Sequence, residues 1–226
     1  MTILAVTGLK KEARIAGGAG VVAVAGGGDG AGLARKLEAL HGDISGVISV
    51  GLGGGLSPLL KVGDVVVGEC VSFDGPLGQG SKVWPCDTSW RVRLMACLAD
   101  AHQGVVAASD VVLGDGGAKA RLHARTGALA VDMESHIAAR FAAARGLPFA
   151  VLRVISDDAG RALPPAALVG MRGDGGVALG PVLWSLAKNP LQLPALIRTG
   201  RDASKAFREL LRCRDFCGVG FAGPDF

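Results

Sequence analysis

The chain has 226 residues, of which 50% are hydrophobic and 19% charged, with 36 glycines and no tyrosine. This length and composition predict a single folded domain with a full core, and they exclude a disordered chain. No apolar run approaches the roughly 20 residues of a membrane-spanning helix. The net charge of +4 is local, because residues 198–214 hold six basic residues against Asp202 and Glu209, and the rest of the chain balances at zero.

The first part of the chain alternates short apolar segments with glycine-rich turns. Three strands are predicted there, at residues 2–7, 21–25 and 46–50. Residues 10–12 lie in the turn or the first helical turn after the first strand. Glycines at 26–30 lead into a helix and would let backbone N–H groups approach an anion or a sugar, although a tight connection explains them as well.

The middle of the chain continues this alternation. A glycine-rich loop at 51–56 precedes residues 61–67, where a Val-Gly-Asp turn starts the next strand. Residues 73–87 are predicted to form a loop because they are rich in glycine and proline. Beyond them we expect a strand at 105–112, a helix at 116–126 and a strand at 128–131.

The most informative stretch opens with Met133-Glu134 at the start of an alanine-rich helix. The apolar run 149–155 then predicts a strand that is buried on both faces and ends at Ser156-Asp157. About 12 helical residues travel roughly 18 Å, and about 7 strand residues return roughly 23 Å. Glu134 and Asp157 should therefore lie at the same end of the domain, where open α/β sheets bind their ligands.

This pair of motifs, Met133-Glu134 opening a helix and Arg153-Val-Ile-Ser-Asp157 closing a strand, resembles the nucleoside phosphorylase superfamily. It is most similar to the nucleosidase branch, which cleaves methylthioadenosine and adenosylhomocysteine. The resemblance covers roughly residues 1–160 and implies cleavage of an N-glycosidic bond. We expect the corresponding α/β fold, a three-layer αβα sandwich with a mixed, twisted central sheet.

Two positions depart from the pattern of the superfamily. The loop that lines the ribose and nucleophile site in relatives has Leu52-Gly53 here, so a hydroxyl that would help to hold phosphate is absent. Val112 replaces an aromatic residue that lies against the purine in relatives. Aliphatic side chains or another residue, with Trp84 as a candidate, must then stack on the base.

The chemistry needs a proton for the leaving purine, and Asp157 is the candidate acid if burial raises its pKa towards the working pH. As an alternative it caps a helix, a role that Asp158 also fits. Ionised Glu134 would accept hydrogen bonds from both ribose hydroxyls and stabilise positive charge on the sugar. Its alternative role is an interaction with the helix dipole. Met133 and Ser156 are expected to contact the substrate beside them.

The sequence leaves two candidates for the nucleophile, water and phosphate. The resemblance implies that Glu12 activates an attacking water. Arg153 could steer that water or hold a phosphate with Lys10 and Lys11, although a structural ion pair also explains a buried arginine.

No cofactor is expected, and phosphate could serve as a co-substrate. No metal site is expected either, because Cys213 and Cys217 form a single pair without a nearby histidine. The five cysteines, an odd number in a long chain, do not form a disulfide framework.

The C-terminal region, residues 161–212, is predicted to be helical. Residues 177–188 are strongly apolar and carry Trp184. Basic residues at spacings of 3, 4, 3 and 4 form one stripe of the last helix: Arg198, Arg201, Lys205, Arg208 and Arg212.

This combination resembles the hopanoid-biosynthesis-associated phosphorylases, in which the nucleoside carries a large pentacyclic lipid. The resemblance implies cleavage of adenosylhopane with release of adenine. The apolar segment 177–188 could line an exit for the lipid, and the basic stripe could contact anionic headgroups. An ordinary solvated helix face explains the stripe as well.

Other functions remain open. The alternative enzyme is a methylthioadenosine/adenosylhomocysteine nucleosidase or a purine nucleoside phosphorylase that acts on soluble nucleosides. An inactive nucleoside-binding or membrane-associated scaffold is disfavoured because Glu12, Glu134 and Asp157 are all retained.

The domain organisation follows from these assignments. We expect one nucleoside phosphorylase-like domain at 1–212 and a flexible tail at 213–226. The resemblance implies a homodimer, and no nucleic-acid partner is expected. The N-terminus shows no signal peptide, so a cytoplasmic protein is expected, with peripheral contact at the inner membrane face as an extension.

Overall fold

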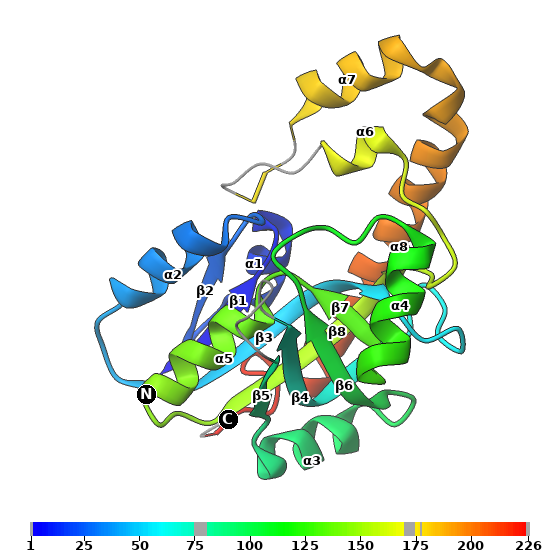
Figure 1. Cartoon of the computed structure of the whole chain (residues 1–226). Coiled ribbons are helices and arrows are strands. Elements are labelled where there is room, and N and C mark those ends of the chain that lie inside the picture. Colours follow the sequence, from blue (N-terminus) through cyan, green and yellow to red (C-terminus); the bar gives the residue numbers. More distant parts are fainter. Residues whose placement is uncertain (1, 75–80, 170–174, 177, 225–226) are drawn as a thin grey trace.

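The computed structural model describes residues 2–74, 81–169, 175–176 and 178–224, and it follows the predicted alternation of strands and helices (Figure 1). The strands are β1 (Thr2–Thr7), β2 (Val21–Ala25), β3 (Ile44–Gly55), β4 (Val65–Asp74), β5 (Ser81–Pro85), β6 (His102–Ala108), β7 (Ala130–Asp132) and β8 (Phe149–Asp157). The helices are α1 (Lys10–Ala16), α2 (Gly30–Glu38), α3 (Thr88–Cys97), α4 (Gly116–Thr126), α5 (Ser135–Ala144), α6 (Pro165–Leu168), α7 (Leu179–Lys188) and α8 (Leu193–Cys217), with a 3₁₀ turn η1 (Pro190–Gln192).

The strands form one mixed sheet. β1 pairs in parallel with both β2 and β3. β3 is long enough to pair in parallel with β8 and, near its carboxyl end, in antiparallel with β7. β8 also pairs antiparallel with β4, while β6 is parallel to both β4 and β7. These pairings close β3, β8, β4, β6 and β7 into a ring, so the sheet is strongly curved.

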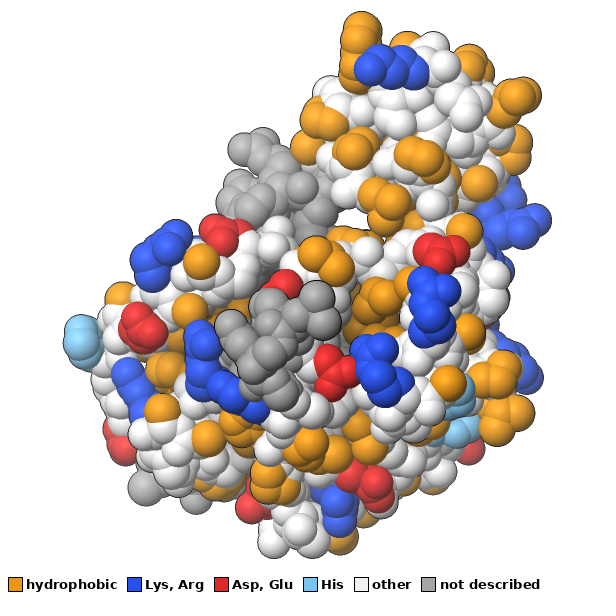
Figure 2. Space-filling model, viewed as in Figure 1, with side chains coloured by type: hydrophobic (Ala, Val, Ile, Leu, Met, Phe, Trp, Pro, Cys, Tyr) orange, Lys and Arg blue, Asp and Glu red, His pale blue; other side chains and the backbone are white. Residues whose placement is uncertain are grey.

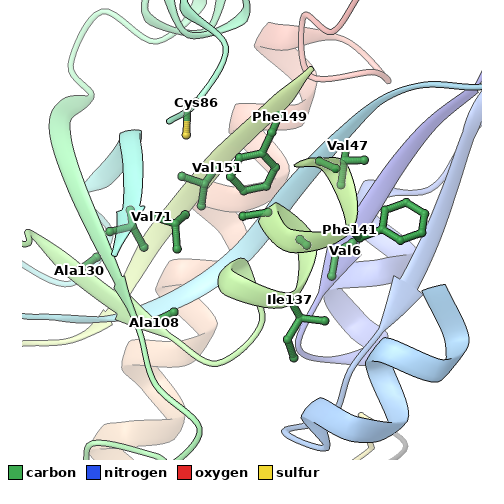
Figure 3. Close-up of a cluster of buried hydrophobic side chains, with 14 of the residues drawn as sticks. Val6, Val47, Val71, Cys86, Ala108, Ala130, Ile137, Phe141, Phe149 and Val151 are labelled. Carbon is green, nitrogen blue, oxygen red and sulfur yellow. The ribbon is translucent and has the colours of Figure 1, made fainter. Parts of the chain in front are cut away.

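Both faces of the sheet are buried. Along β1, Leu4 and Val6 join one core cluster, whereas Ile3 and Ala5 join another on the opposite face, because successive side chains of a strand point to opposite sides. α2 and α5 cover the first face, where Ile137 of α5 points into the cluster that contains Val6 (Figure 3). α1, α3 and α8 cover the second face. The predicted three-layer αβα fold with a mixed central sheet is confirmed.

Some predicted segments have different boundaries. β2 and α4 match the prediction, but β6 ends at Ala108 because the Ser109 hydroxyl donates to the carbonyl of Val111 and turns the chain. Within the predicted loop 73–87, residues 81–85 instead form β5, which gives β4 an antiparallel partner at the edge of the sheet. Residues 75–80 lie outside the described part of the chain.

Helix α3 has no counterpart in the prediction. Its start does carry a sequence signal, because Asp87 accepts a hydrogen bond from the backbone N–H of Trp90 at 2.7 Å. Such a capping aspartate is a common start of a helix.

The predicted flexible tail from residue 213 is wrong for residues 213–224. α8 continues to Cys217, and Phe221 is completely buried beyond it. The indole N–H of Trp90 donates to the Phe221 carbonyl at 2.7 Å, and Arg93 donates to the Ala222 carbonyl at the same distance. Residues 218–224 therefore pack against the core around α3, and the boundary expected at residue 212 falls inside α8.

α6, α7, η1 and the first turns of α8, residues 165–169 and 178–200, project from the sheet as an arm (Figure 1). Figure 2 shows hydrophobic side chains gathered on the surface of this arm. Leu179, Leu183 and Trp184 of α7 are all about two-thirds exposed, at 68%, 64% and 65%. Among the described residues, none of the helices is both long enough and apolar enough to cross a membrane.

Candidate active site

A cavity of about 260 Å³ lies at the carboxyl end of β3, bordered by the starts of α1 and α5. Gly54 explains why these segments meet, because it pairs with Val131 of β7 on one side and with Asp157 of β8 on the other. The chain therefore brings Glu134, two residues after β7, and Asp157, the last residue of β8, to the same cavity. The expectation that these two carboxylates share one end of the domain is confirmed.

Glu12 is a buried carboxylate in the first turn of α1. Its Oε2 accepts hydrogen bonds from the backbone N–H groups of Gly8 and Leu9 at 2.8 and 2.7 Å, and its Oε1 accepts one from Leu52 at 2.9 Å. Burial raises the pKa of Glu12, while these three N–H groups and the Arg153 guanidinium oppose the rise. Glu12 thus joins the β1–α1 turn to β3 and borders the cavity.

Glu134 projects towards the same space from the start of α5. Asp132 caps this helix, because its Oδ1 accepts hydrogen bonds from the backbone N–H groups of Glu134 and Ser135 at 3.0 and 2.9 Å. Both carboxylate oxygens of Glu134, and Oε2 of Glu12, lie 3.3 Å from the point where a Cβ on residue 8 would stand. Gly8 therefore allows two carboxylates to face each other.

This crowding changes the charge expected for Glu134. Burial and the negative charges of Asp132 and Glu12 raise the pKa of Glu134 to about 8, although Arg153 opposes the rise. Near pH 7 the carboxyl group is then mostly protonated, in contrast to the ionised carboxylate expected from the sequence. The difference arises from burial, from the neighbouring Asp132 and from Glu12, which is far from Glu134 in sequence, so that the sequence does not show that these two face each other.

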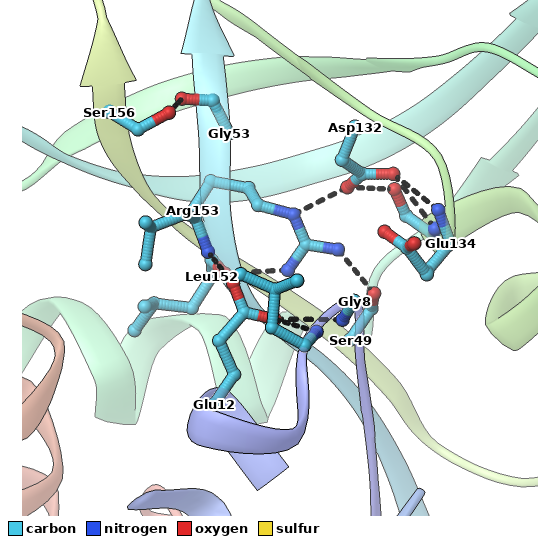
Figure 4. A network of polar contacts seen from close by, with 12 residues as sticks. Gly8, Glu12, Ser49, Gly53, Asp132, Glu134, Leu152, Arg153 and Ser156 are labelled. Carbon is cyan, nitrogen blue, oxygen red and sulfur yellow. Dashed lines mark hydrogen bonds and ion pairs between the residues drawn. The ribbon is translucent and has the colours of Figure 1, made fainter. Parts of the chain in front are cut away.

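Arg153 lies between Glu12 on one side and Asp132 and Glu134 on the other (Figure 4), and it does not border the cavity. Its Nε donates to Asp132 Oδ2 and its Nη2 to Ser49 Oγ, both at 2.5 Å, and its Nη1 donates to the Leu152 carbonyl at 2.9 Å. The guanidinium is almost completely buried. This geometry corresponds to the structural ion pair, and the guanidinium is not where it would hold a phosphate or a water in the cavity.

Asp157 is held by a residue that the sequence did not suggest. The ammonium of Lys119, on α4, donates to Asp157 Oδ2 and also to the carbonyl of Asp158 at 3.0 Å. Asp157 Oδ1 accepts a hydrogen bond from the Ser156 hydroxyl at 2.7 Å. Asp158 pairs with Arg161 at 2.8 Å, so neither aspartate caps a helix.

The remaining residues predicted to bind the substrate also border the cavity: Leu52, Gly53, Val112, Met133 and Ser156. Trp84 does not, because it lies on β5 and packs against the core cluster under α5. The walls near Val112 are therefore aliphatic, with Val111 and Leu113 beside it.

A model of the family described as the Phosphorylase superfamily matches residues 9–170. The chain belongs to this superfamily. Its membership confirms the predicted superfamily and the prediction of an enzyme of this class. The match ends after α6, so α7 and α8 lie beyond it.

The fold of this phosphorylase-superfamily protein is similar to solved structures of nucleoside-cleaving enzymes. One is the 5′-methylthioadenosine/S-adenosylhomocysteine nucleosidase of S. pneumoniae, with a TM-score of 0.60 and 18% identity over 93% of this chain and 100% of that chain. The corresponding enzyme of Campylobacter jejuni gives a TM-score of 0.61 and 15% identity over 94% and 99%. A futalosine hydrolase mutant of Helicobacter pylori gives 0.59 and 18% over 69% and 90%. At sequence identities of 15–18%, these similarities show that the fold is shared.

Two parts of the candidate site were not predicted from the sequence, namely Lys119 and the outer wall of the cavity. Lys119 lies in a correctly predicted helix, but nothing in the sequence separates it from an exposed lysine. The outer wall of the cavity comes from the α6 region and from α8, through Leu163, Ala167, Leu168, Thr199 and Ala203.

The predicted lipid exit along residues 177–188 is not observed. Trp184 and the rest of α7 do not border the cavity, and α6 and α8 take that place. Residue 177 lies outside the described part of the chain. In the basic stripe, Lys205 donates to the Val62 carbonyl at 2.6 Å, whereas Arg198, Arg201 and Arg208 are exposed.

Proposed function

We propose that this superfamily member is an enzyme that cleaves the N-glycosidic bond of a purine nucleoside. The observation that carries the proposal is the convergence of Glu12, Glu134 and Asp157 in one cavity. Cleavage leaves positive charge on the sugar and negative charge on the base. A carboxylate near the sugar stabilises the positive charge, and a carboxylic acid near the base supplies a proton. The names of the solved relatives, nucleosidases and a futalosine hydrolase, support the same class of reaction.

The two carboxyl groups have separate roles in this proposal. Glu134 hydrogen-bonds the ribose hydroxyls, and the positive charge that develops on the sugar favours its ionised form in the transition state. Asp157, beside Ser156 and the aliphatic wall around Val112, supplies the proton to the leaving base.

The charge of the cavity favours water over phosphate as the nucleophile. Four carboxylate residues border it, Glu12, Asp132, Glu134 and Asp157, and no lysine or arginine does so among the described residues. A phosphate dianion would therefore find no cation in the described lining to bind it, because the charge of Arg153 is already paired with Asp132. Glu12 is then the group that orients and activates the water.

The proposed substrate is adenosylhopane, with adenine as the released base. The support is the apolar outer wall, where Leu163, Ala167 and Leu168 would contact a hydrocarbon on the 5′ side of the sugar. Burial of such a group stabilises the complex by roughly 25 cal/mol per Å². A soluble nucleoside is the alternative, and the names of the solved nucleosidases support it.

The arm suits contact with an anionic membrane. Its exposed apolar side chains include Leu183, Trp184 and Leu191. Residues 178–201 carry Lys188, Arg198 and Arg201 but no aspartate or glutamate. Basic residues near an anionic surface contribute about 1 kcal/mol each. The proposed membrane contact therefore moves from the basic stripe to α7 and its neighbours.

A homodimer is also proposed. Val111 and Val112 border the cavity yet are 67% and 40% exposed, and a neighbouring chain would cover them. Elution of the purified protein as a monomer at micromolar concentration would count against this part of the proposal.

The test of the reaction is incubation with adenosine, methylthioadenosine, adenosylhomocysteine and an adenosine whose 5′ carbon carries a polycyclic hydrocarbon, each with and without phosphate. Chromatography should show free adenine and free sugar, fastest with the lipid-linked nucleoside and independent of phosphate. The double variant Glu134→Gln/Asp157→Asn, purified in parallel, reports any contaminating activity. Release of no base from any of the four would favour a binding scaffold instead.

Membrane contact is tested separately by co-sedimentation with vesicles. Wild-type protein should bind anionic vesicles more strongly than neutral ones, and less strongly as salt is added. Leu183→Glu/Trp184→Glu should lose this binding, whereas charge removal at Arg208 and Arg212, outside the arm, should not. If both variants bind the anionic vesicles equally, the arm does not contact the membrane and is an ordinary solvent-exposed surface.

A further inference from the structure

Lys119 is the one fully buried lysine in the described part of the chain, with 0% exposure. It belongs to α4, and its Nζ forms an ion pair with Asp157 and a hydrogen bond to the Asp158 carbonyl at 3.0 Å. Gly54 packs against this pair, since an added Cβ there would stand 3.3 Å from Asp157 Oδ2 and 3.6 Å from Lys119 Cε.

Stability alone does not account for such a pair. Taking an ammonium and a carboxylate out of water costs several kcal/mol per ion, and apolar residues of similar volume are often equally or more stabilising in such places. Asp157 borders the cavity where Glu12 and Glu134 also converge, and Lys119 contacts Asp157 without bordering the cavity itself. The pair therefore places a buried cation next to a carboxyl group of the candidate active site.

We propose that Lys119 is a positioning residue for Asp157, an inference that rests on the proposed function. Lys119 holds Oδ2 and the next carbonyl, so the chain after β8 is fixed and Oδ1, next to the Ser156 hydroxyl, is left for the base. The pair therefore keeps the Asp157 carboxyl group in one orientation at the cavity.

The other charged groups near the cavity lie around Glu12 and Glu134, where the sugar is proposed to bind. They are Glu12 of α1, Glu134 at the start of α5, and the Asp132–Arg153 pair of β7 and β8. Beyond Asp157, Asp158 is paired with Arg161, which in turn pairs with Asp202 of α8. Among the described residues, Lys119 is the cation in direct contact with the Asp157 carboxylate.

The experiment measures kcat and KM from pH 5 to 10, with the nucleoside that the wild type cleaves fastest. Lys119→Met should lower the maximal kcat by about tenfold or more, because the acid is no longer held in place. KM should change much less than kcat, because Lys119 does not border the cavity and acts through Asp157. Lys36→Met is the matched control, because Lys36 also donates to a carbonyl, that of Ala25, but on an exposed helix face.

Two further variants separate the effects. Lys119→Gln keeps hydrogen-bonding groups without the charge, so it should recover much of the kcat that Lys119→Met loses, and it also serves if Lys119→Met fails to fold. In an Asp157→Asn background, Lys119→Met should have little additional effect, because it acts through Asp157.

The outcomes are distinct. A kcat of Lys119→Met equal to that of the wild type, a change mainly in KM, or a loss that multiplies fully with that of Asp157→Asn overturns the inference while leaving the proposed function intact. A wild type that cleaves no nucleoside overturns the proposed function and this inference with it.

Discussion

Replacing Glu134 by glutamine should stabilise the folded protein at alkaline pH. Burial, Asp132 and Glu12 raise the pKa of Glu134 from 4.5 to about 8. Since the folded state holds this proton more tightly than the unfolded state, the stability from this group is fully present below pH 4.5 and is lost as the pH rises to about 8. Each pH unit corresponds to about 1.4 kcal/mol, so the ionised group costs the folded state up to about 5 kcal/mol at pH 9. The neutral amide of the variant avoids that cost.

Urea unfolding at pH 5 and pH 9 measures this difference. The gain in the free energy of unfolding of Glu134→Gln over the wild type should increase by several kcal/mol between the two pH values, although its activity falls. Glu38→Gln, at an exposed position of α2, should change the free energy of unfolding by less than about 0.5 kcal/mol at either pH. An equal gain at both pH values would refute the idea that Glu134 is destabilised by its burial and by neighbouring carboxylates.

Three more predictions follow from the site and the core. Asp157→Asn should lower kcat on the order of 10²–10⁴, and near-full turnover would place the proton donor elsewhere. Glu12→Gln should abolish cleavage by water and spare cleavage by phosphate if both occur, whereas equal loss of the two would contradict its assignment to the water. Phe221→Ala should lower the free energy of unfolding in urea by about 3–5 kcal/mol, because the side chain is completely buried, and a loss below about 1 kcal/mol would mean that the end of the chain is only loosely attached.

The features that depend on local periodicity could be predicted from the sequence. The buried strand β8 and the helix before it have definite lengths, and these lengths alone place Glu134 and Asp157 at one end of the sheet. Leu52 and Gly53, which the resemblance to the superfamily assigned to the ribose and nucleophile site, also border the cavity.

The features that depend on contacts between distant segments could not be predicted. Lys119 reaches Asp157 across 38 residues, and Trp90 reaches Phe221 across 131 residues, so neither contact has a local pattern. The glycines after residue 217 suggested a loose tail, whereas tertiary packing under α3 orders it. Likewise, the apolar character of α7 predicted burial at the cavity, but its side chains are exposed on the arm.

Isotopic labelling of the solvent tests the proposed hydrolysis most directly. The wild-type protein is incubated in ¹⁸O-labelled water with the nucleoside that it cleaves fastest, in the presence of phosphate, and the sugar product is examined by mass spectrometry. The free sugar, incubated alone, corrects for spontaneous exchange. Hydrolysis at the cavity of Glu12, Glu134 and Asp157 predicts one ¹⁸O atom per released sugar, no label in adenine and no sugar phosphate. An unlabelled sugar 1-phosphate, or intact nucleoside throughout, would contradict it.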